Sequence, residues 1–115
     1  MKHLVAAARR RMFDVLLSSA AAQAAMMTLR PGQSSSDEPE NEHPRCEQWL
    51  FVLRGTGRAI VGKSRTMIRR NSLLLIEKQE PHQITCTGRT PLVTLNFYVP
   101  AAYTDDGDLR PSAKR

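Results

Sequence analysis

The chain has 115 residues, of which 41% are hydrophobic, and it carries a formal net charge of +6. This length supports a single domain with a small hydrophobic core. No apolar run reaches the roughly 18 residues that a membrane-spanning helix requires, so the sequence predicts no membrane association. The two cysteines, Cys46 and Cys86, are too few for a disulfide framework. We interpret both as buried reduced thiols, which is typical of a cytoplasmic protein; a redox-active pair at a pocket mouth is the alternative.

The positive charge is concentrated near the two ends of the chain. Arg9, Arg10 and Arg11 form a tight basic cluster, and Lys114 and Arg115 lie at the other end. We interpret these residues as solvated termini rather than as a nucleic-acid-binding face. The alternative is a polyanion-binding protein, whose affinity would fall steeply with salt and would disappear when residues 1–11 and 110–115 are removed.

The N-terminal extension, residues 1–23, is compatible with two structures. Leu4, Val5, Ala8 and Met12 fall near helical spacing, which predicts a helical arm, whereas residues 13–17 are also compatible with a first strand. Residues 24–29 then predict a strand, which Pro31 and Gly32 end. Residues 33–42 contain four acids and no apolar side chain except a proline, which is typical of a surface loop.

The rest of the chain contains short apolar segments that are separated by turn residues. Residues 49–53 are almost continuously apolar, which predicts a strand that is buried on both faces or lies inside a barrel wall. A hairpin is predicted around Gly62 over residues 58–69, and further strands over 73–76, 82–86 and 92–99. This pattern indicates an all-β fold, an antiparallel β-barrel or jelly roll over residues 24–103. The polar segment 104–115 is predicted to be a disordered tail.

Two groups of polar residues flank these apolar segments. In the first group, Asn41 and His43 precede Gln48, and six residues separate Gln48 from Gly55. In the second group, His82 opens a predicted strand. The arrangement resembles that of the small single-domain cupins (the cupin 2 type of conserved barrel). Their first motif is a His-x-His followed by an acid and a glycine, and their second motif contains a histidine with an asparagine four residues later. The resemblance covers about residues 24–103 and implies a double-stranded β-helix, the cupin form of the jelly roll.

Carried over to this chain, the resemblance implies candidate metal ligands at five positions. His43 and His82 match histidines of the two motifs, and Asn41 stands where the family has its first histidine. Gln48 stands at the position of the acid, with Glu47 beside it. Side chains alternate along a strand, so only one of these two reaches the barrel interior. The full candidate set is therefore His43, His82, Gln48, Glu47 and Asn41.

The resemblance also implies a divalent transition metal, namely zinc, nickel, iron or manganese, and a small polar ligand inside the barrel. Chemistry of the dioxygenase or isomerase class is implied by family analogy alone. The candidate ligands other than Glu47 are neutral, so they would hold a metal weakly unless Glu47 or Glu42 supplies a carboxylate. Two alternatives stay open. The first is a metal-free binding or sensing module, and the second is a histidine pair that is hydrogen-bonded to Gln48 and water.

Three other side chains are predicted to border the ligand pocket: Trp49, Cys86 and Tyr98. For Trp49 a place in the core or at an interface is the alternative. Cys86 stands where the family has the asparagine of its second motif. A barrel of this size leaves apolar strand surface at its edges, which predicts a homodimer.

Overall fold

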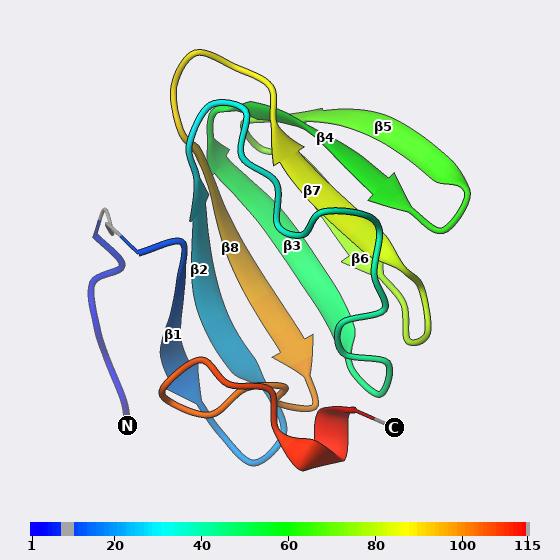
Figure 1. The fold of residues 1–115 in the computed structure, drawn as a ribbon. Helices are drawn as coiled ribbons and strands as arrows, with labels where there is room; N and C mark the ends of the chain where they lie inside the picture. Colours follow the sequence, from blue (N-terminus) through cyan, green and yellow to red (C-terminus); the bar gives the residue numbers. More distant parts are fainter. Residues whose placement is uncertain (8–10, 115) are drawn as a thin grey trace.

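The fold consists of two antiparallel β-sheets (Figure 1). The computed structural model describes residues 1–7 and 11–114, so the predictions for residues 8–10 and 115 lie outside the described residues. The five-stranded sheet has the order β1 (Phe13–Ser18), β2 (Gln23–Leu29), β8 (Leu92–Val99), β3 (Glu47–Arg54), β6 (Leu73–Ile76). The three-stranded sheet has the order β5 (Ser64–Arg69), β4 (Thr56–Val61), β7 (His82–Cys86).

This architecture confirms the antiparallel all-β jelly roll that the sequence predicts. Residues 1–7 form neither helix nor strand, and residues 13–17 lie within β1. The only helix in the described part of the chain is the short 3-10 helix η1 (Pro111–Ala113). Over the same residues, no helix is both long and apolar enough to span a bilayer.

Alternating side chains along β3 define the inside of the barrel. Gln48, Leu50 and Val52 are buried, and so are the residues of β8 with which they pair. The side chains between them point outward, and Trp49 is 38% exposed while Phe97, its partner in β8, is 41% exposed. Of the two alternatives for residues 49–53, burial on both faces is wrong, because the protein covers only one face of this sheet, and the strand is part of the barrel wall.

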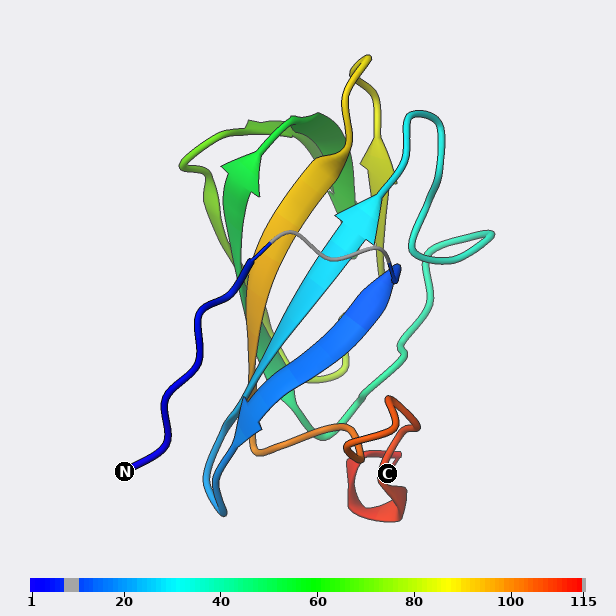
Figure 2. The same ribbon diagram turned by 90° about the vertical axis from the view of Figure 1, so that its left-hand side faces the viewer.

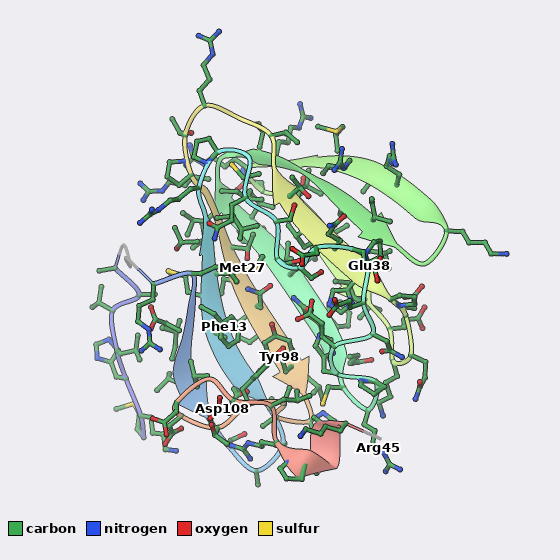
Figure 3. The ribbon with its side chains drawn as sticks, in the orientation of Figure 1. Phe13, Met27, Glu38, Arg45, Tyr98 and Asp108 are labelled. Carbon is green, nitrogen blue, oxygen red and sulfur yellow. The ribbon has the colours of Figure 1, made fainter. Side chains whose placement is uncertain are left out.

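The interior is apolar at one end and polar at the other. The apolar end is a cluster of buried side chains from both sheets, which includes Leu50, Val52, Ile68, Ile84 and Leu92. Each such side chain contributes about 1.5–3 kcal/mol through burial, so this end holds the two sheets together. Figure 3 shows Phe13, Met27 and Tyr98 in the middle of the molecule, where the polar end begins, and Glu38 and Arg45 on loops at its periphery.

Gly55 joins β3 in one sheet to β4 in the other. Its φ of +90° lies in the left-handed region, where L side chains are strained. A Cβ atom at this position would overlap the carbonyl oxygen of Pro91 and lie 2.8 Å from the Cα atom of Leu92. Only glycine allows the chain to change sheets at this point while it packs against the start of β8.

The acidic loop, residues 33–42, runs along β7. Isolated bridges pair Ser34 with Thr85 and Glu40 with His82. The Ser35 N–H donates to the carbonyl oxygen of Ile84 at 2.8 Å, which adds a further link to the same strand. The loop thus covers a sheet edge that would otherwise expose unpaired backbone groups, and it delivers Glu42 and His43 to the barrel interior.

The segment 104–114, where the sequence predicts a disordered tail, packs against the end of the barrel (Figure 2). Ala113 is buried in a cluster with Cys46 and Tyr98, and Leu109 packs against that cluster. The Arg110 Nε–H donates to the carbonyl oxygen of Tyr103 at 2.7 Å. The apolar side chains of Leu109 and Ala113, together with a few backbone hydrogen bonds, dock the segment. The polar composition of the segment does not reveal these contacts.

The outer face of the five-stranded sheet exposes large apolar side chains. Trp49 lies between its strand partners Leu75, which is 40% exposed, and Phe97. Leu73 and Val99 lie on strands of the same sheet and are also exposed. Homodimerisation stays a prediction, and this outer face is the surface of the described chain that best matches it.

Candidate functional site

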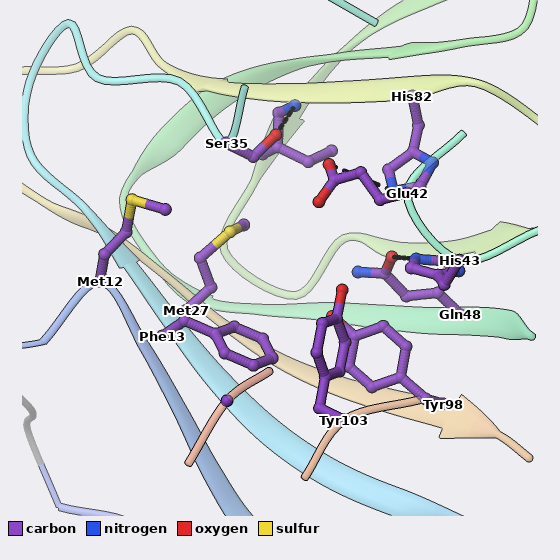
Figure 4. A pocket seen from close by; sticks show the side chains of 12 residues that line it. Met12, Phe13, Met27, Ser35, Glu42, His43, Gln48, His82, Tyr98 and Tyr103 are labelled. Carbon is purple, nitrogen blue, oxygen red and sulfur yellow. Dashed lines mark hydrogen bonds and ion pairs between the residues drawn. The ribbon is translucent and has the colours of Figure 1, made fainter. Parts of the chain in front are cut away.

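The polar end of the barrel surrounds a cavity of about 200 Å³. Residues from both sheets, from the acidic loop and from the segment after β8 line it (Figure 4). The polar side chains that line it are Ser35, Glu42, His43, Gln48, His82, Tyr98 and Tyr103. The sequence predicts His43, Gln48 and His82 as metal ligands and Tyr98 as a pocket residue. It also offers Glu42 as a possible source of a carboxylate.

A tight turn holds the ring of His43 in place. The Cys46 N–H donates to the carbonyl oxygen of His43 at 2.9 Å, and Pro44 occupies the second position, where its fixed φ favours such a turn. The His43 Nδ1 atom lies 3.1 Å from the carbonyl oxygen of Cys46, which can only accept a hydrogen bond. Nδ1 therefore carries the proton of the neutral ring, and the lone pair is on Nε2.

The Nε2 atom of His43 faces the side-chain amide of Gln48, with 2.9 Å between Nε2 and Oε1. The Gln48 Nε2–H in turn donates to Oδ1 of Asn96 at 2.9 Å. Turning the Gln48 amide alone would bring two oxygens together at Asn96. Turning both amides would direct Asn96 Oδ1 at the carbonyl oxygen of Ala25, to which its Nδ2–H now donates. With Gln48 Oε1 toward the ring, two lone pairs face each other, and a proton or a cation between them reconciles the contact. With both amides turned, Gln48 Nε2–H would donate to the ring, and Asn96 Oδ1 would accept from the Thr94 hydroxyl at 3.0 Å.

His82 presents the same nitrogen to the cavity. It opens β7, and its Nδ1–H donates to the carbonyl oxygen of Glu80 at 3.0 Å, so its lone pair is also on Nε2. Burial, and to a lesser degree the proximity of His43, lowers the pKa of His82 below its ordinary 6.5. The two imidazole rings lie 4.9 Å apart between centroids. Both rings therefore direct Nε2 into the cavity, and His82 does so as a neutral imidazole at neutral pH.

Glu42 is the carboxylate of this cavity. Its Oε1 atom lies 3.9 Å from Nε2 of His82. Burial and the charge of Glu40 raise the pKa of Glu42 from 4.5 to about 7. Because the pKa of His82 is lowered, this contact is not an ion pair at neutral pH. Within residues 1–7 and 11–114, no three His, Cys, Asp or Glu side chains come close enough together to form a metal site by themselves.

The raised pKa of Glu42 predicts an unusual dependence of stability on pH. Between its unfolded value of 4.5 and its folded value of about 7, the native state holds a proton that the unfolded state releases, so stability falls as pH rises. Replacing Glu42 with glutamine is expected to stabilise the metal-free protein at pH 8.5 by about 1–2 kcal/mol, after allowance for partial exposure, and to change little at pH 5. Urea denaturation at several pH values measures this difference.

His82 does not contribute to the change in stability at pH 8.5. Its lowered pKa affects stability only below about pH 6.5, where stability rises with pH. Glu47→Gln is the matched control, since the Glu47 side chain is on the outside of β3 and accepts from Trp49 Nε1–H at 3.0 Å. If Glu42→Gln and Glu47→Gln had the same effect at pH 8.5, the buried Glu42 carboxylate would not be the cause.

Tyrosine rings form one wall of the cavity. Tyr98 and Tyr103 pack edge to face with centroids 5.0 Å apart, and the ring of His43 lies 5.1 Å from that of Tyr98. Burial raises the pKa of both phenols above the ordinary value of 10. The phenols therefore stay protonated at physiological pH and can act as hydrogen-bond partners.

Several predicted site residues lie outside this cavity. Asn41 is exposed and donates from Nδ2 to Gln79 at 3.3 Å. Glu47 and Trp49 contact each other on the outer face of β3. Cys86 is buried in the apolar core and Cys46 beneath the C-terminal segment, and both thiols are free. The structure therefore brings together His43, Gln48, His82 and Tyr98, and it separates Asn41, Glu47, Trp49 and Cys86 from them.

Several residues that complete the cavity carry no motif in the sequence. Met12 immediately precedes β1, Phe13 is the first residue of β1, Met27 lies on β2, and Gly107 lies in the segment after β8. Met12 and Gly107 share the cavity with His43 and His82, although they lie far from them in the sequence. The alternation of strand β2 is the one signal that could have placed Met27 inside, because Ala25 and Leu29 on the same face are fully buried.

The chain belongs to the cupin family. The model of the cupin domain matches residues 25–98, which include His43, Gln48 and His82. Among curated proteins, no sequence matches the chain significantly.

Solved structures share this fold. A Bacillus halodurans protein (BH2720) is 22% identical, with a TM-score of 0.78 over 89% of this chain and 79% of its own. A predicted oxalate decarboxylase from Thermotoga maritima is 25% identical, with a TM-score of 0.67 over 76% of this chain and 78% of its own. KdgF from a Halomonas species is 12% identical, with a TM-score of 0.69 over 82% of this chain and 80% of its own. At these identities the structures support the fold, and the chemistry has to be argued from the cavity.

Proposed function

We propose that this cupin holds a divalent metal ion at the polar end of its cavity and binds a small polar ligand beside it. The observation that carries the proposal is the spacing of His43 Nε2 and Gln48 Oε1, which lie 2.9 Å apart with Nε2 directed at the amide. Two ligands at right angles on an ion about 2.1 Å away from each are separated by about 3 Å. The spacing of these two atoms is thus favourable for a pair of metal ligands.

The donor set fits a divalent transition metal. His43 and His82 donate their Nδ1 protons to backbone carbonyls, which is the arrangement that orients metal-binding histidines in proteins. Gln48 would supply an amide oxygen, and Glu42 would supply the negative charge that the other three donors lack. Imidazole and oxygen donors together suit zinc, nickel, iron or manganese. Such an ion supplies a Lewis acid that can polarise a ligand oxygen, water or dioxygen.

The test is a zinc titration of metal-free protein by calorimetry, together with elemental analysis of protein purified without chelator. We expect the wild type to bind about one ion per chain. His82→Ala is expected to weaken binding by about 100-fold or more, because it removes one of only two imidazoles. His3→Ala is the matched control, since His3 is the exposed histidine of the N-terminal segment. Equal binding by wild type and His82→Ala, or no binding by either, would contradict the proposal.

A metal-free binding module is the second candidate. The amide of Gln48, at the position where the family has an acid, favours it, because an amide is a poor metal ligand and a good hydrogen-bond partner. In this case a ligand hydroxyl would take the place of the ion and donate to His43 Nε2 and Gln48 Oε1. A folded protein that binds ligand but no zinc, nickel, iron or manganese would support this candidate.

The reaction class remains a proposal at the level of the family. One structural neighbour is a predicted oxalate decarboxylase, and KdgF is another. For this chain we propose chemistry of the dioxygenase or isomerase class, in which the cavity residues bind and orient the ligand and exclude water. The polyanion-binding protein stays an alternative, and part of its basic N-terminal cluster and the last residue lie outside the described residues.

A further inference from the structure

The cavity has two chemically different ends (Figure 4). The imidazoles of His43 and His82 and the amide of Gln48 lie at one end. Met12, Met27 and the ring of Phe13 lie at the other end. This division goes beyond the metal ligands, because a metal or a small polar ligand would fill only the first end.

The volume limits the size of the ligand. At about 200 Å³ the cavity is smaller than the roughly 300–1,000 Å³ of pockets that take drug-sized molecules. It exceeds the ~150 Å³ of an engineered apolar cavity that binds benzene. One six-membered ring with one or two small substituents therefore matches the available space.

Aromatic and thioether side chains shape the apolar end. The ring of Phe13 lies 4.7 Å from that of Tyr103 with a tilt of 58°, and 6.3 Å from that of Tyr98. Edge-to-face contacts of this kind are favourable for a further ring, and methionine sulfur also packs well against aromatic edges. A flat ring can thus contact Phe13 and the two methionines at once.

The charges in the cavity limit the charge of the ligand. Among residues 1–7 and 11–114, no lysine or arginine lines it, and Glu42 is the only acidic residue that does. A small dianion would leave water for a site with no cationic side chain and would face a carboxylate. An uncharged ligand with hydroxyl groups has no such cost, and its hydroxyls can donate to the lone pairs of His43 and Gln48.

We propose that the cavity binds small uncharged ring compounds that carry hydroxyl groups, with the hydroxyls at the His43–Gln48 end and the ring against Met12, Phe13 and Met27. The inference rests on the metal-free binding candidate, in which ligand hydroxyls take the place of the ion, and it names the ligand class for the same cavity. It distinguishes this chain from a cupin that selects a small dicarboxylate.

The experiment titrates metal-free protein with catechol and, separately, with oxalate, following amide chemical shifts by NMR and heat by calorimetry. We expect catechol to bind and oxalate not to bind. Met27→Gln, which keeps the length of the side chain but puts an amide at the apolar end, is expected to weaken catechol binding by about tenfold or more. Met12→Gln tests the same end at a partly exposed position where folding is not at risk. Met67→Gln is the matched control, because Met67 is 64% exposed on β5.

The inference is overturned if oxalate binds as tightly as catechol, or if both Met12→Gln and Met27→Gln bind catechol like the wild type. A zinc titration of the same variants separates the two proposals. Normal zinc binding without catechol binding would overturn the ligand class alone. Catechol binding that responds to Met12→Gln, with no zinc binding, would overturn the metal proposal and leave the ligand class standing.

Discussion

Replacing Gln48 with glutamate is expected to raise the affinity for a divalent metal by about 100-fold, which corresponds to ~2.7 kcal/mol. The substitution keeps the shape of the side chain and places a negative charge where the amide oxygen lies 2.9 Å from Nε2 of His43. A single charge about 4 Å from a divalent ion gains roughly 8 kcal/mol at the effective dielectric of a protein, and desolvation of the buried carboxylate offsets the larger part. Competition with a zinc indicator at pH 7.5 measures the change.

The same substitution is expected to destabilise the metal-free protein. Gln48 Nε2–H donates to Oδ1 of Asn96, and a carboxylate would turn this donor into a second acceptor beside a fully buried side chain. Leaving such a pair unsatisfied costs about 1–3 kcal/mol, and bound zinc should restore the loss. Glu47→Gln changes a carboxylate on the outer face of the same strand and should leave zinc affinity unchanged. A folded Gln48→Glu variant with wild-type zinc affinity would show that this side chain does not contact the ion.

Replacing Gly55 with alanine is expected to cost about 3 kcal/mol or more of folding free energy, a large part of the ~5–15 kcal/mol that a domain typically has. The φ of +90° alone strains an L residue by about 1–2 kcal/mol. The added Cβ atom would also meet backbone atoms of Pro91 and Leu92, which cannot move without shifting β8. Urea denaturation followed by fluorescence of Trp49 measures the loss.

Gly32 provides the matched control for this prediction. Its φ is +82°, and nothing lies within 4 Å of the position that a Cβ atom would take. Gly32→Ala should therefore cost only the conformational strain, about 1–2 kcal/mol. Equal losses at both positions would mean that the contact of Gly55 with β8 has no energetic weight.

The fold was predictable because its strands are short and local signals bound them. Gly62 marks the hairpin of β4 and β5, and the strand predicted over 92–99 coincides with β8. The C-terminal segment was not predictable in this way, because Ala113 is buried through contacts with residues far away in the sequence. A single small side chain that packs against Cys46 leaves no periodic pattern.

The candidate site was predictable where residues lie on strands and much less where they lie on loops. Counting back from Gly55 places Gln48 at the acid position, and strand alternation then puts Glu47 and Trp49 on the opposite face. The structure agrees with this alternation, so placing Trp49 at the pocket was inconsistent with placing Gln48 inside. Glu42 lies on a loop, where no periodicity fixes the direction of a side chain, and only the contacts of that loop with β7 bring it inside.

The origin of the two ends of the cavity bears on how such a protein can diverge. Every residue of the proposed metal-binding end lies within 25–98, the part that matches the cupin domain. Met12, Phe13, Tyr103 and Gly107, which line much of the remainder, lie outside that part. The barrel can therefore retain the proposed metal-binding residues while substitutions in the flanking segments change which ligands fit the cavity. Selection for a new ligand would then act on the flanking segments, while the proposed metal-binding end stays within the cupin domain.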